Sequence, residues 1–330
     1  MNFYSIIIYG YSILAIFLIY IISRDSKKEG SFLNSKKPLS IILRIILGIG
    51  ILMAIEAYFI EPNLLLVKNT GIESGKISNP IKIALITDIQ VGNHKKEKFV
   101  QKLVQKINTT EPDLILLGGD LIDNEGNFDN EEVYLEPLKE LVGKYPIYYI
   151  LGNHEYGIGS YLQNHPSKHT ADKSEWLITK MEELGIPLLR NTLDCLEIKN
   201  KNICIFGIDD IWHSLCHSRE GGNPGNCFGN INFNKNIFNI LLTHNPDGIL
   251  YYPKDTIQPD LVLAGHTHGG QIYIPFIGPL GDPDVKLNKK YWRGLNYYNG
   301  IPILTSVGVG ESGGKIRLFT PPTIDIITIN

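Results

Sequence analysis

The feature that most constrains this chain is a repeated pattern in which a short apolar run ends directly before a polar side chain. Continuous apolar runs are typical of strands buried on both faces of a sheet, with helices packed outside. The polar residues that follow the runs are Asp88, Asp120, Asn153, His244, His266 and His268. In open α/β sheets, ligands bind at the edge where the strands end. The pattern therefore predicts an α/β fold in which these side chains form one site.

Strands and helices are expected to alternate through the body of the chain. The spacing of Phe99, Leu103 and Ile107 predicts a helix over 95–107, and a second helix is expected over about 130–142. The expected strands cover 81–86, 113–117, 146–151, 194–199, 203–207, 239–243 and 260–264.

The N-terminal segment differs from the body in having no charge between Asn2 and Ser23. At about 1.5 Å per residue, a helix of this length covers a hydrocarbon core of roughly 30 Å. A signal peptide would have a basic start and a small-residue cleavage site, and neither is present here. We therefore expect a retained transmembrane span at about 3–22.

A second apolar stretch runs from Leu39 to Ile60 and contains Arg44 and Glu56 near its ends, where long side chains can reach the headgroups. Its strictly uncharged part, Ile45–Ile55, is shorter than a span requires. Two interpretations follow: a second span at about 39–60, or a helix lying in the headgroup plane. The first makes residues 1–60 a membrane anchor and 61–330 the body.

The basic loop at 23–38 predicts the orientation of the anchor. Its Arg24–Pro38 stretch carries five basic and two acidic side chains, so the positive-inside rule places it in the cytoplasm. With two spans, the body of this integral cell-membrane protein lies outside the cytoplasmic membrane. With one span, the body lies in the cytoplasm.

The charge and the cysteine content exclude a nucleic-acid-binding protein and a protein built on a disulfide framework or a CxxC zinc site. Residues 61–330 carry 25 basic and 31 acidic side chains, so no nucleic-acid partner is expected. Four cysteines are too few for a disulfide framework or a CxxC zinc site. Cys195 and Cys204 are expected to be buried thiols in strands. Cys216 and Cys227 lie in a Gly- and Asn-rich loop insertion at about 214–230, where a disulfide is an alternative.

Five blocks resemble the signatures of the calcineurin-like metallophosphoesterase superfamily, which are D-x-H, GDxxD, GNHE, a later His and GHxH. They read DIQ at 88–90, GDLID at 119–123, GNHE at 152–155, LLTHNPD around His244 and GHTH at 265–268. GHTHGGQIYIPFIGP and VGVGESGGKIRLFTPPTIDIITI are similar to its membrane-anchored, transmembrane subfamily. The resemblance covers about 62–330. It implies a four-layer α/β/β/α sandwich behind a transmembrane hairpin, with the site on loops between two sheets.

The resemblance also implies a hydrolase of phosphoester or pyrophosphate bonds with two divalent cations, whose bridging hydroxide is the nucleophile. Mixed nitrogen and oxygen ligands favour Mn, Fe or Zn, with Mg an alternative. His154 would stabilise the transition state or protonate the leaving oxygen, with Asp123 orienting it; the other interpretation of Asp123 is a helix cap. The implied metal ligands are Asp88 and His268 for the first cation, Asp120 as the bridge, and Asn153, His244 and His266 for the second.

One position departs from the superfamily pattern, because Gln90 stands where D-x-H has its histidine. A glutamine oxygen is a poorer ligand than imidazole for Zn or Fe. The first position is therefore expected to bind more weakly, to take Mn or Mg, or to fill only with substrate present. His94 could compensate, although a solvated loop histidine is the simpler interpretation.

Three functions remain open. The leading one is a membrane-anchored phosphoesterase with a phosphorylated substrate, for which the subfamily suggests a lipid-linked compound such as a UDP-diacylglucosamine-type glycolipid. That glycolipid would be met on the cytoplasmic face, in conflict with two spans. The others are a degenerate metal- or partner-binding protein without turnover, motivated by Gln90, and a general phosphodiesterase or phosphatase on soluble esters.

Three further motifs have simple interpretations. His165 and His169 are expected to be solvated. Asp209-Asp210-Ile211-Trp212 either touches substrate or forms a turn. The run GVGESGG at 308–314 lacks the GK[ST] of a phosphate loop and is expected to be a turn-rich segment only.

Overall fold

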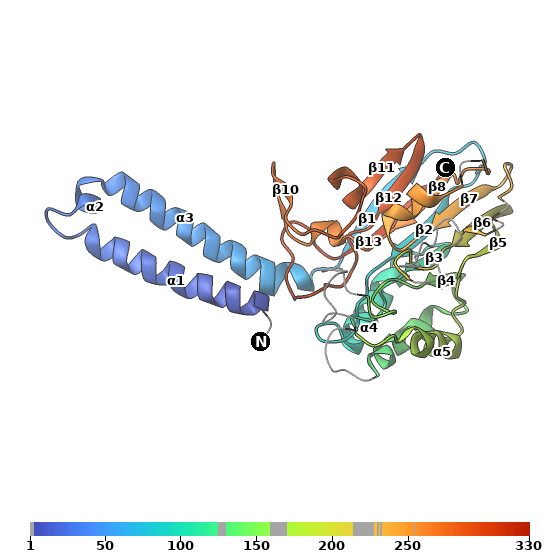
Figure 1. The fold of residues 1–330 in the computed structure, drawn as a ribbon, viewed down its shortest axis with the longest axis horizontal. Helices are drawn as coiled ribbons and strands as arrows, with labels where there is room; N and C mark the ends of the chain where they lie inside the picture. Colours follow the sequence, from blue (N-terminus) through green and yellow to red (C-terminus); the bar gives the residue numbers. More distant parts are fainter. Residues whose placement is uncertain are drawn as a thin grey trace, which may run out of the picture.

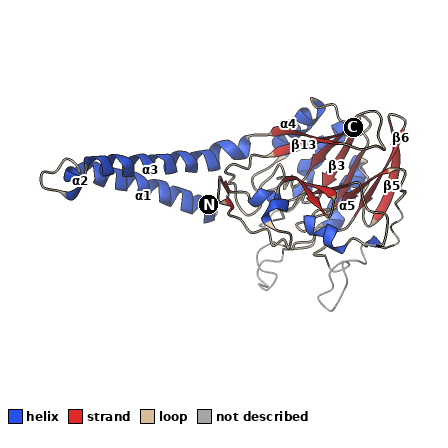
Figure 2. Ribbon diagram, turned by 90° about the horizontal axis from the view of Figure 1, so that it is seen from above, coloured by secondary structure: helices blue, strands red, loops and turns tan. Residues whose placement is uncertain are grey.

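The computed structural model describes residues 3–124, 130–158, 170–213, 228–229, 231, 233–253 and 255–330. An extended helical hairpin projects from an α/β body that contains two large sheets (Figures 1 and 2).

The first sheet has five strands with a parallel centre. Its order is β1 (Leu66–Ile72), β13 (Thr323–Ile329), β2 (Ile81–Ile86), β3 (Leu114–Gly118) and β4 (Ile147–Ile150). Strands β2, β3 and β4 run parallel, while β13 is antiparallel to β2 and parallel to β1. The predicted strands at 81–86, 113–117 and 146–151 are therefore confirmed to within a residue or so at each end.

The second sheet has six strands, and antiparallel strands form both its edges. Its order is β11 (Gly294–Tyr298), β12 (Ile301–Thr305), β8 (Leu261–Ala264), β7 (Phe238–Leu242), β6 (Lys201–Gly207) and β5 (Thr192–Ile198). Strands β12, β8, β7 and β6 are parallel. A separate two-stranded hairpin pairs β9 (Tyr273–Ile274) with β10 (Gly278–Pro279).

The two large sheets share an apolar core. Ile83 and Leu85 of β2 belong to the same buried cluster as Ile205 of β6, Leu242 of β7 and Leu263 of β8. Each of these strands is buried on both faces, as the continuous apolar runs predict.

Helices cover the outer face of the first sheet. They are α4 (Glu97–Asn108), α5 (Ser174–Leu184) and the 3₁₀ helix η3 (Glu131–Leu141), which contribute Val100, Leu103 and Met181 to a second buried cluster. The helix expected over 130–142 is thus a 3₁₀ helix. Pro137 lies inside it, and a proline cannot donate the main-chain hydrogen bond that a regular α-helix needs.

The outer layer on the second sheet differs from the α-helical layer that the resemblance implies. In the described part of the chain it consists of loops and the 3₁₀ helices η6 (Pro246–Tyr251) and η8 (Lys289–Trp292). Aromatic side chains fill this layer, including Phe206, Tyr252 and Tyr291. The body is therefore an α/β fold with a regular helical cover on one side.

The helical hairpin comprises α1 (Phe3–Asp25), the short α2 (Phe32–Ser35) and α3 (Lys37–Ile55), which continues through a π turn, η1 (Glu56–Ile60), and a 3₁₀ turn, η2 (Glu61–Asn63). Helices α1 and α3 lie side by side. Arg44 Nη1 donates to Ser23 Oγ at 3.3 Å. By length and composition, one helix among the described residues, Lys37–Asn63, is apolar enough to cross a membrane.

The end of this helix is joined to the body by polar and apolar contacts. Ala57 packs with Ile316 and Leu318, and its carbonyl oxygen accepts a hydrogen bond from Arg317 N at 2.9 Å. The Glu61 carboxylate accepts hydrogen bonds from the main-chain N–H groups of Phe319, at 2.7 Å, and Thr320. The segment 316–320 is therefore held directly against the base of the hairpin.

The expectation that Cys195 and Cys204 are buried thiols is wrong, because they form a disulfide. The antiparallel register of β5 and β6 places the two residues directly opposite each other, which brings their side chains together. Cys195 is exposed on the edge strand, while Cys204 is buried. Cys216 and Cys227 lie outside the described residues.

Candidate metal centre

The predicted ligands converge where strands of both sheets end. Asp88 follows β2, Asp120 follows β3, Asn153 and His154 follow β4, His244 follows β7, and His266 and His268 follow β8. All seven are buried. The parallel arrangement of these strands explains the convergence, because their carboxyl ends face the same edge of the body.

The backbone is strained where it presents several of these side chains. Asp88, Asp120, His266 and His268 have φ angles of 54°, 52°, 70° and 49°, and Gln90 has 47°. This left-handed region is costly for residues other than glycine, and such strain concentrates at functional sites. Gly152 shows how closely the loops approach, since a Cβ there would lie 2.3 Å from Asp120 Oδ1.

Four ligand atoms meet at the position predicted for the second cation. His244 Nε2 lies 3.0 Å from Asp120 Oδ2, 3.2 Å from Asn153 Oδ1 and 3.3 Å from His266 Nδ1. His266 Nδ1 also lies 2.9 Å from Asn153 Oδ1. Asp120, His244 and His266 each place a ligand atom within 4.8 Å of the others.

The imidazole rings of His244 and His266 each contact a main-chain carbonyl on the side away from the position of the second cation, and these contacts determine which ring nitrogen faces that position. His244 Nδ1 lies 2.8 Å from Gly118 O, and His266 Nε2 lies 3.0 Å from Pro283 O. When both imidazoles are neutral and donate to these carbonyls, each turns its other nitrogen, with a lone pair, toward the oxygens of Asp120 and Asn153. Acceptors then face acceptors, and a divalent cation satisfies all four. The residues fit a metal with mixed nitrogen and oxygen ligands.

Charge in this cluster is balanced without a cation only by protonating a histidine. Burial lowers the pKa of His244, but the Asp120 carboxylate beside it raises the value to about 10. Burial and the charge of His244 lower the pKa of His266 to about 3. The pKa of Asp120 lies below its usual range, because the charges of His244 and His154 outweigh the effect of burial. Without a cation, the extra proton on His244 balances the Asp120 carboxylate, and a metal ion can supply that positive charge in its place.

The position predicted for the first cation has a different arrangement. His268 Nε2 lies 3.5 Å from Asp88 Oδ1, and Arg317 Nη2 lies 3.3 Å from His268 Nδ1. Arginine can only donate, so a neutral His268 that accepts from Arg317 carries its proton on Nε2, toward Asp88. Burial and Arg317 hold the pKa of His268 well below its usual value. His268 thus has a donor, Arg317, on its far nitrogen, whereas the far nitrogens of His244 and His266 face carbonyl oxygens.

Gln90 is buried with 2% of its surface exposed. Within the described part of the chain, neither its amide nitrogen nor its amide oxygen has a hydrogen-bond partner. A buried amide without partners is costly, and coordination of a cation through the oxygen would satisfy one of these atoms. His94, the predicted alternative, is exposed.

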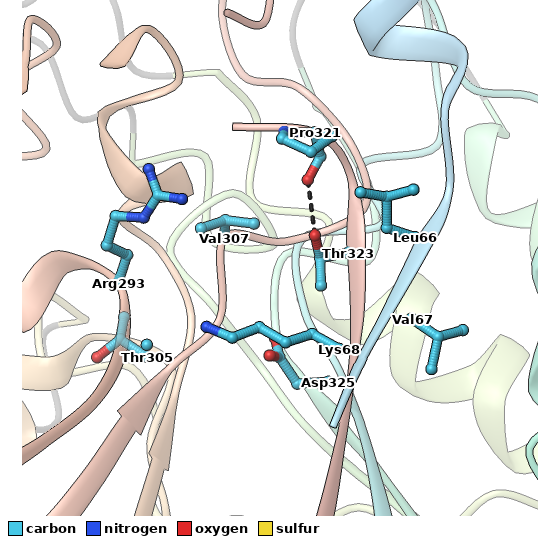
Figure 3. Close-up of a pocket in the computed structure, with 10 residues that line it drawn as sticks. Leu66, Val67, Lys68, Arg293, Thr305, Val307, Pro321, Thr323 and Asp325 are labelled. Atoms are coloured by element: carbon cyan, nitrogen blue, oxygen red, sulfur yellow. Dashed lines mark hydrogen bonds between the residues drawn. The ribbon is translucent and has the colours of Figure 1, made fainter. Parts of the chain in front are cut away.

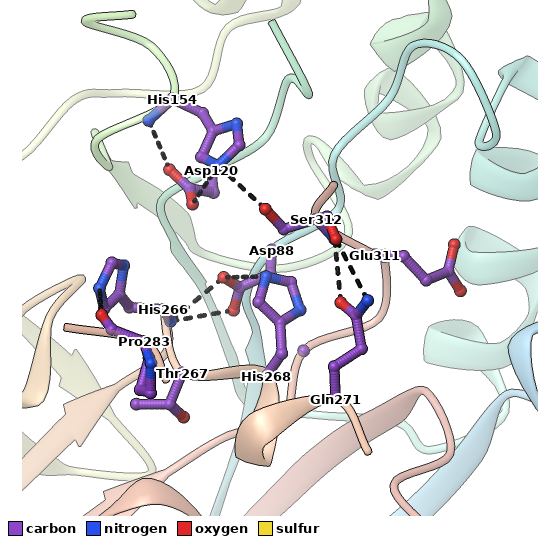
Figure 4. A network of polar contacts seen from close by, with 12 residues as sticks. Asp88, Asp120, His154, His266, Thr267, His268, Gln271, Pro283, Glu311 and Ser312 are labelled. Atoms are coloured by element: carbon purple, nitrogen blue, oxygen red, sulfur yellow. Dashed lines mark hydrogen bonds and ion pairs between the residues drawn. The ribbon is translucent and has the colours of Figure 1, made fainter. Parts of the chain in front are cut away.

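His154 lies beside Asp120, and its ring also faces Ser312 (Figure 4). Its main-chain N–H donates to Asp120 Oδ1 at 2.9 Å, and its Nε2 lies 3.9 Å from Asp120 Oδ2 and 3.4 Å from Ser312 Oγ. Its Nδ1 is 2.5 Å from the main-chain carbonyl oxygen of Asp123. The contact that orients the ring thus comes from the main chain of Asp123, and a catalytic role for that carboxylate stays a prediction.

Two buried residues that carry no predicted role organise these loops. The Glu155 carboxylate accepts main-chain hydrogen bonds from Asp120, Leu121, Ile122 and Gly152 at 2.7–3.2 Å. The Arg317 guanidinium donates to the carbonyl oxygens of Val307, Gly310 and Thr320. In the sequence, Glu155 is marked only by its place in the GNHE block. No motif spacing marks Arg317.

The expectation that 308–314 is merely turn-rich is wrong. A Cβ on Gly308 would lie 2.7 Å from Asp88 Cβ, Gly310 N donates to Asp88 O at 2.6 Å, and Ser312 contacts His154. The segment forms one wall of the centre because its glycines allow the backbone to pass directly over Asp88.

The segment 209–212 supports the site. Asp209 accepts hydrogen bonds from Tyr156 at 2.6 Å and Arg190 at 2.9 Å. The ring of Trp212 packs edge-on against His266, with ring centroids 4.6 Å apart. Asp209 is therefore a structural anchor, and Trp212 restrains a predicted ligand. His165 and His169 lie outside the described residues.

A separate cavity of about 330 Å³ opens between β1, β13 and the second sheet (Figure 3). Lys68, Arg293, Thr305 and Asp325 are among its lining residues, and no predicted ligand is. Burial raises the pKa of Asp325 to about 6.

Comparisons with known proteins identify the family of the chain. Residues 81–270 match the family described as calcineurin-like phosphoesterase. An uncharacterized metallophosphoesterase of Campylobacter jejuni is 32% identical over 301 residues, which cover 89% of this chain and 72% of that protein. The phosphodiesterase YaeI of Escherichia coli is 28% identical over 255 residues, covering 76% and 82%. A dimetal phosphatase of Danio rerio aligns with a TM-score of 0.38 and 11% identity, covering 70% of this chain and 88% of that one.

Proposed function

The chain belongs to the calcineurin-like phosphoesterase family and is a metal-dependent phosphoesterase, and from this we propose a membrane-anchored hydrolase with two unequal cation positions. Its substrate is a lipid-linked phosphoester or pyrophosphate. The observation that carries the proposal is the convergence of Asp120, Asn153, His244 and His266, whose potential ligand atoms lie 2.9–3.3 Å from one another in four pairs.

Divalent cations held by Asp120, Asn153, His244 and His266 would polarise the phosphoryl oxygens and lower the pKa of water, so that hydroxide would be available near neutral pH. Hydrolysis adds the oxygen of one water to phosphorus and breaks the bond to the leaving oxygen, which takes up a proton. His154 is suited to deliver that proton. Its Nδ1 is held by Asp123 O, and its Nε2 lies on the side of Asp120 and Ser312.

The first position is proposed to hold its cation more weakly than the second. Gln90 offers a neutral amide in place of an imidazole, and Arg317 competes for the orientation of His268. Mn²⁺ or Mg²⁺, which prefer oxygen ligands, are better suited to this position than Zn²⁺. A degenerate protein without turnover is the alternative that these two residues favour.

Membrane attachment is proposed through the hairpin of α1 and α3. The apolar Lys37–Asn63 helix and the exposure of Ile45, Ile49 and Leu52 support it. The disulfide between Cys195 and Cys204 supports a body outside the cytoplasm, since disulfides persist in oxidising compartments. A body outside the cytoplasm agrees with two membrane spans. As a substrate, it favours a phosphoester of an outer-leaflet lipid over a nucleotide-linked glycolipid that is met in the cytoplasm.

The test is hydrolysis of bis-p-nitrophenyl phosphate by the full chain in detergent, after chelation and readdition of Mn²⁺, Zn²⁺, Fe²⁺ or Mg²⁺. We expect turnover only with added metal, and its loss in both Asp120→Ala and His154→Ala. Folded protein that shows no turnover on this ester or on phosphorylated lipids with any cation would establish the degenerate alternative. Turnover on the soluble ester but on no lipid would favour a general phosphodiesterase.

A further inference from the structure

The hairpin of β9 and β10 presents an apolar tip to solvent. Phe276 is 108% exposed, Ile277 71% and Leu280 59%. No charged residue occurs between Gln271 and Gly281. Three large apolar side chains on one short hairpin differ from scattered surface hydrophobes, because they form one projecting patch that water solvates poorly.

The stem of this hairpin packs against the base of the proposed anchor. Ile272 and Ile274 contact the cluster of Ala57, Ile316 and Leu318, which includes the last turn of the long helix. Figure 1 places β10 on the side of the body that faces the helical hairpin. The tip therefore lies beside the point where the apolar helix meets the body, and the helix surface and the hairpin together form one apolar region.

Aromatic and cationic groups surround the stem rather than the tip. The Arg293 guanidinium lies 4.7 Å from the centre of the Tyr273 ring, and Lys289 Nζ donates to Pro279 O at 3.2 Å. The exposed Asp282 and Asp284 follow the hairpin in the chain. Segments that enter the membrane interface typically have an apolar tip, with tyrosine, arginine and lysine side chains nearer the headgroups. The hairpin has this distribution, because its tip is apolar and its stem carries these residue types.

The same hairpin is connected to the metal centre. Gln271, at the start of its stem, follows His268 by three residues. The Gln271 amide donates to the carbonyl oxygens of Ser312 and Gly314 at 3.1 and 3.2 Å, and accepts from Ser312 N at 3.1 Å. Ser312 in turn contacts His154. A hairpin seated in lipid would thus hold the wall of the centre close to the bilayer.

We propose that the β9–β10 hairpin is a second membrane contact, with Phe276, Ile277 and Leu280 inserted among the acyl chains of the bilayer that the anchor crosses. This inference rests on the membrane attachment proposed above. The inserted hairpin would hold the metal centre at the membrane surface, where the phosphoester of a lipid can enter from the headgroup layer.

The test places a tryptophan at the tip of the full chain in phosphatidylcholine vesicles, with Phe276→Trp measured against the unmodified chain. Brominated acyl chains should quench the added emission at least about twofold and shift it to shorter wavelength, because the indole lies in hydrocarbon. Leu193→Trp is the matched control. Leu193 is an exposed apolar residue on β5, which Figure 1 places at the far end of the body from the helical hairpin. It should show no quenching.

Ile45→Trp, on the long helix, tests the membrane anchor separately from the hairpin contact. Quenching at Ile45→Trp without quenching at Phe276→Trp overturns the hairpin contact and leaves the anchor intact. Absence of quenching at both positions overturns the anchor as well. Because neither measurement requires turnover, both are independent of the hydrolase assignment.

A second measurement uses the double variant Phe276→Asp with Ile277→Asp. Its activity on a phosphorylated lipid in vesicles should fall at least about tenfold, since charged side chains are excluded from the hydrocarbon, while hydrolysis of bis-p-nitrophenyl phosphate stays within twofold. The matched Phe276→Leu with Ile277→Leu should retain both activities. Equal loss on both substrates would show that the hairpin acts on the centre itself and would overturn the membrane contact.

Discussion

The two proposed cation positions are built from the same kinds of residue and differ in the hydrogen-bond partners of those residues. At the second position, the far nitrogens of His244 and His266 face main-chain carbonyls, so that their near nitrogens are acceptors when the rings are neutral. At the first position, the far nitrogen of His268 faces Arg317, a donor. The outer partner of each histidine therefore decides whether the ring is already prepared to bind a cation.

This difference teaches that ligand identity alone does not describe a metal position. His268 occurs in the family motif as clearly as His266 does, yet only His266 presents a lone pair to other acceptors in this structure. The predictions that follow test the inequality, from the largest expected effect to the smallest.

The strongest prediction concerns the second position. His266→Ala should lower kcat/KM on bis-p-nitrophenyl phosphate by about 10³-fold or more, corresponding to about 4 kcal/mol, because it removes a ligand from the prepared cluster. Steady-state kinetics over a range of Mn²⁺ concentrations measures this. Added cation should not restore the activity, and a loss of less than tenfold would remove the second position from its central role.

The matched change at the first position is His268→Ala. We expect a smaller loss of about 10- to 100-fold, in the range of one weakened metal contact, with partial recovery at high Mn²⁺ because Asp88 and Asp120 remain. The same kinetic series applies. An effect as large as that of His266→Ala, without recovery, would contradict the inequality.

Gln90→His should sharpen the comparison by making the first position more like the second. Imidazole is a better ligand than an amide for Zn²⁺ and Fe²⁺, so the metal concentration that gives half-maximal activity should fall about tenfold. Gln90→Asn, which keeps the amide on a shorter side chain, is the control and should not show this gain. An unchanged metal requirement in Gln90→His would mean that residue 90 is not a ligand.

The last prediction concerns folding stability rather than activity and lies outside the centre, at Asp325 in the separate cavity. Burial raises the pKa of Asp325 from 3.8 to about 6 in the folded state. The folded protein therefore binds this proton more tightly than the unfolded chain, and the stability it contributes below pH 4 is lost as the pH rises through 6. Asp325→Asn should raise the free energy of unfolding by up to about 3 kcal/mol at pH 8, and by nothing comparable at pH 4.

Thermal unfolding of the full chain in detergent at both pH values measures this, with the exposed Asp282→Asn as the control. A stabilisation by Asp325→Asn that is equal at pH 4 and pH 8 would show that the carboxylate does not titrate in this interval.

The sequence predicts the fold and the site best where a continuous apolar run is followed directly by a residue that can bind a metal. The apolar runs predict β2, β3, β4, β7 and β8, and the polar residues behind them are the ones that converge. Burial of both faces of these strands makes the signal strong, because each run must then be continuously apolar. Strands with exposed polar positions, such as β1 and β11, have no such run and were not predicted.

The remaining features depend on contacts between distant segments. Pairing of Cys195 with Cys204 follows from the register of two strands, which spacing alone does not reveal. Arg317 is one of two basic residues in the stretch KIRLF. Its position behind His268 arises only when the C-terminal loop folds over the centre. The role of 308–314 as a wall of the site has the same origin.

The most direct test of the account is a Mn²⁺ titration of the chelated full chain, followed by calorimetry and by the electron paramagnetic resonance of free Mn²⁺. The account predicts two binding events of clearly different affinity, with His266→Ala abolishing the tighter event and His268→Ala only the weaker. Two events of equal affinity, or loss of the same event in both variants, would contradict the proposed inequality of the two positions.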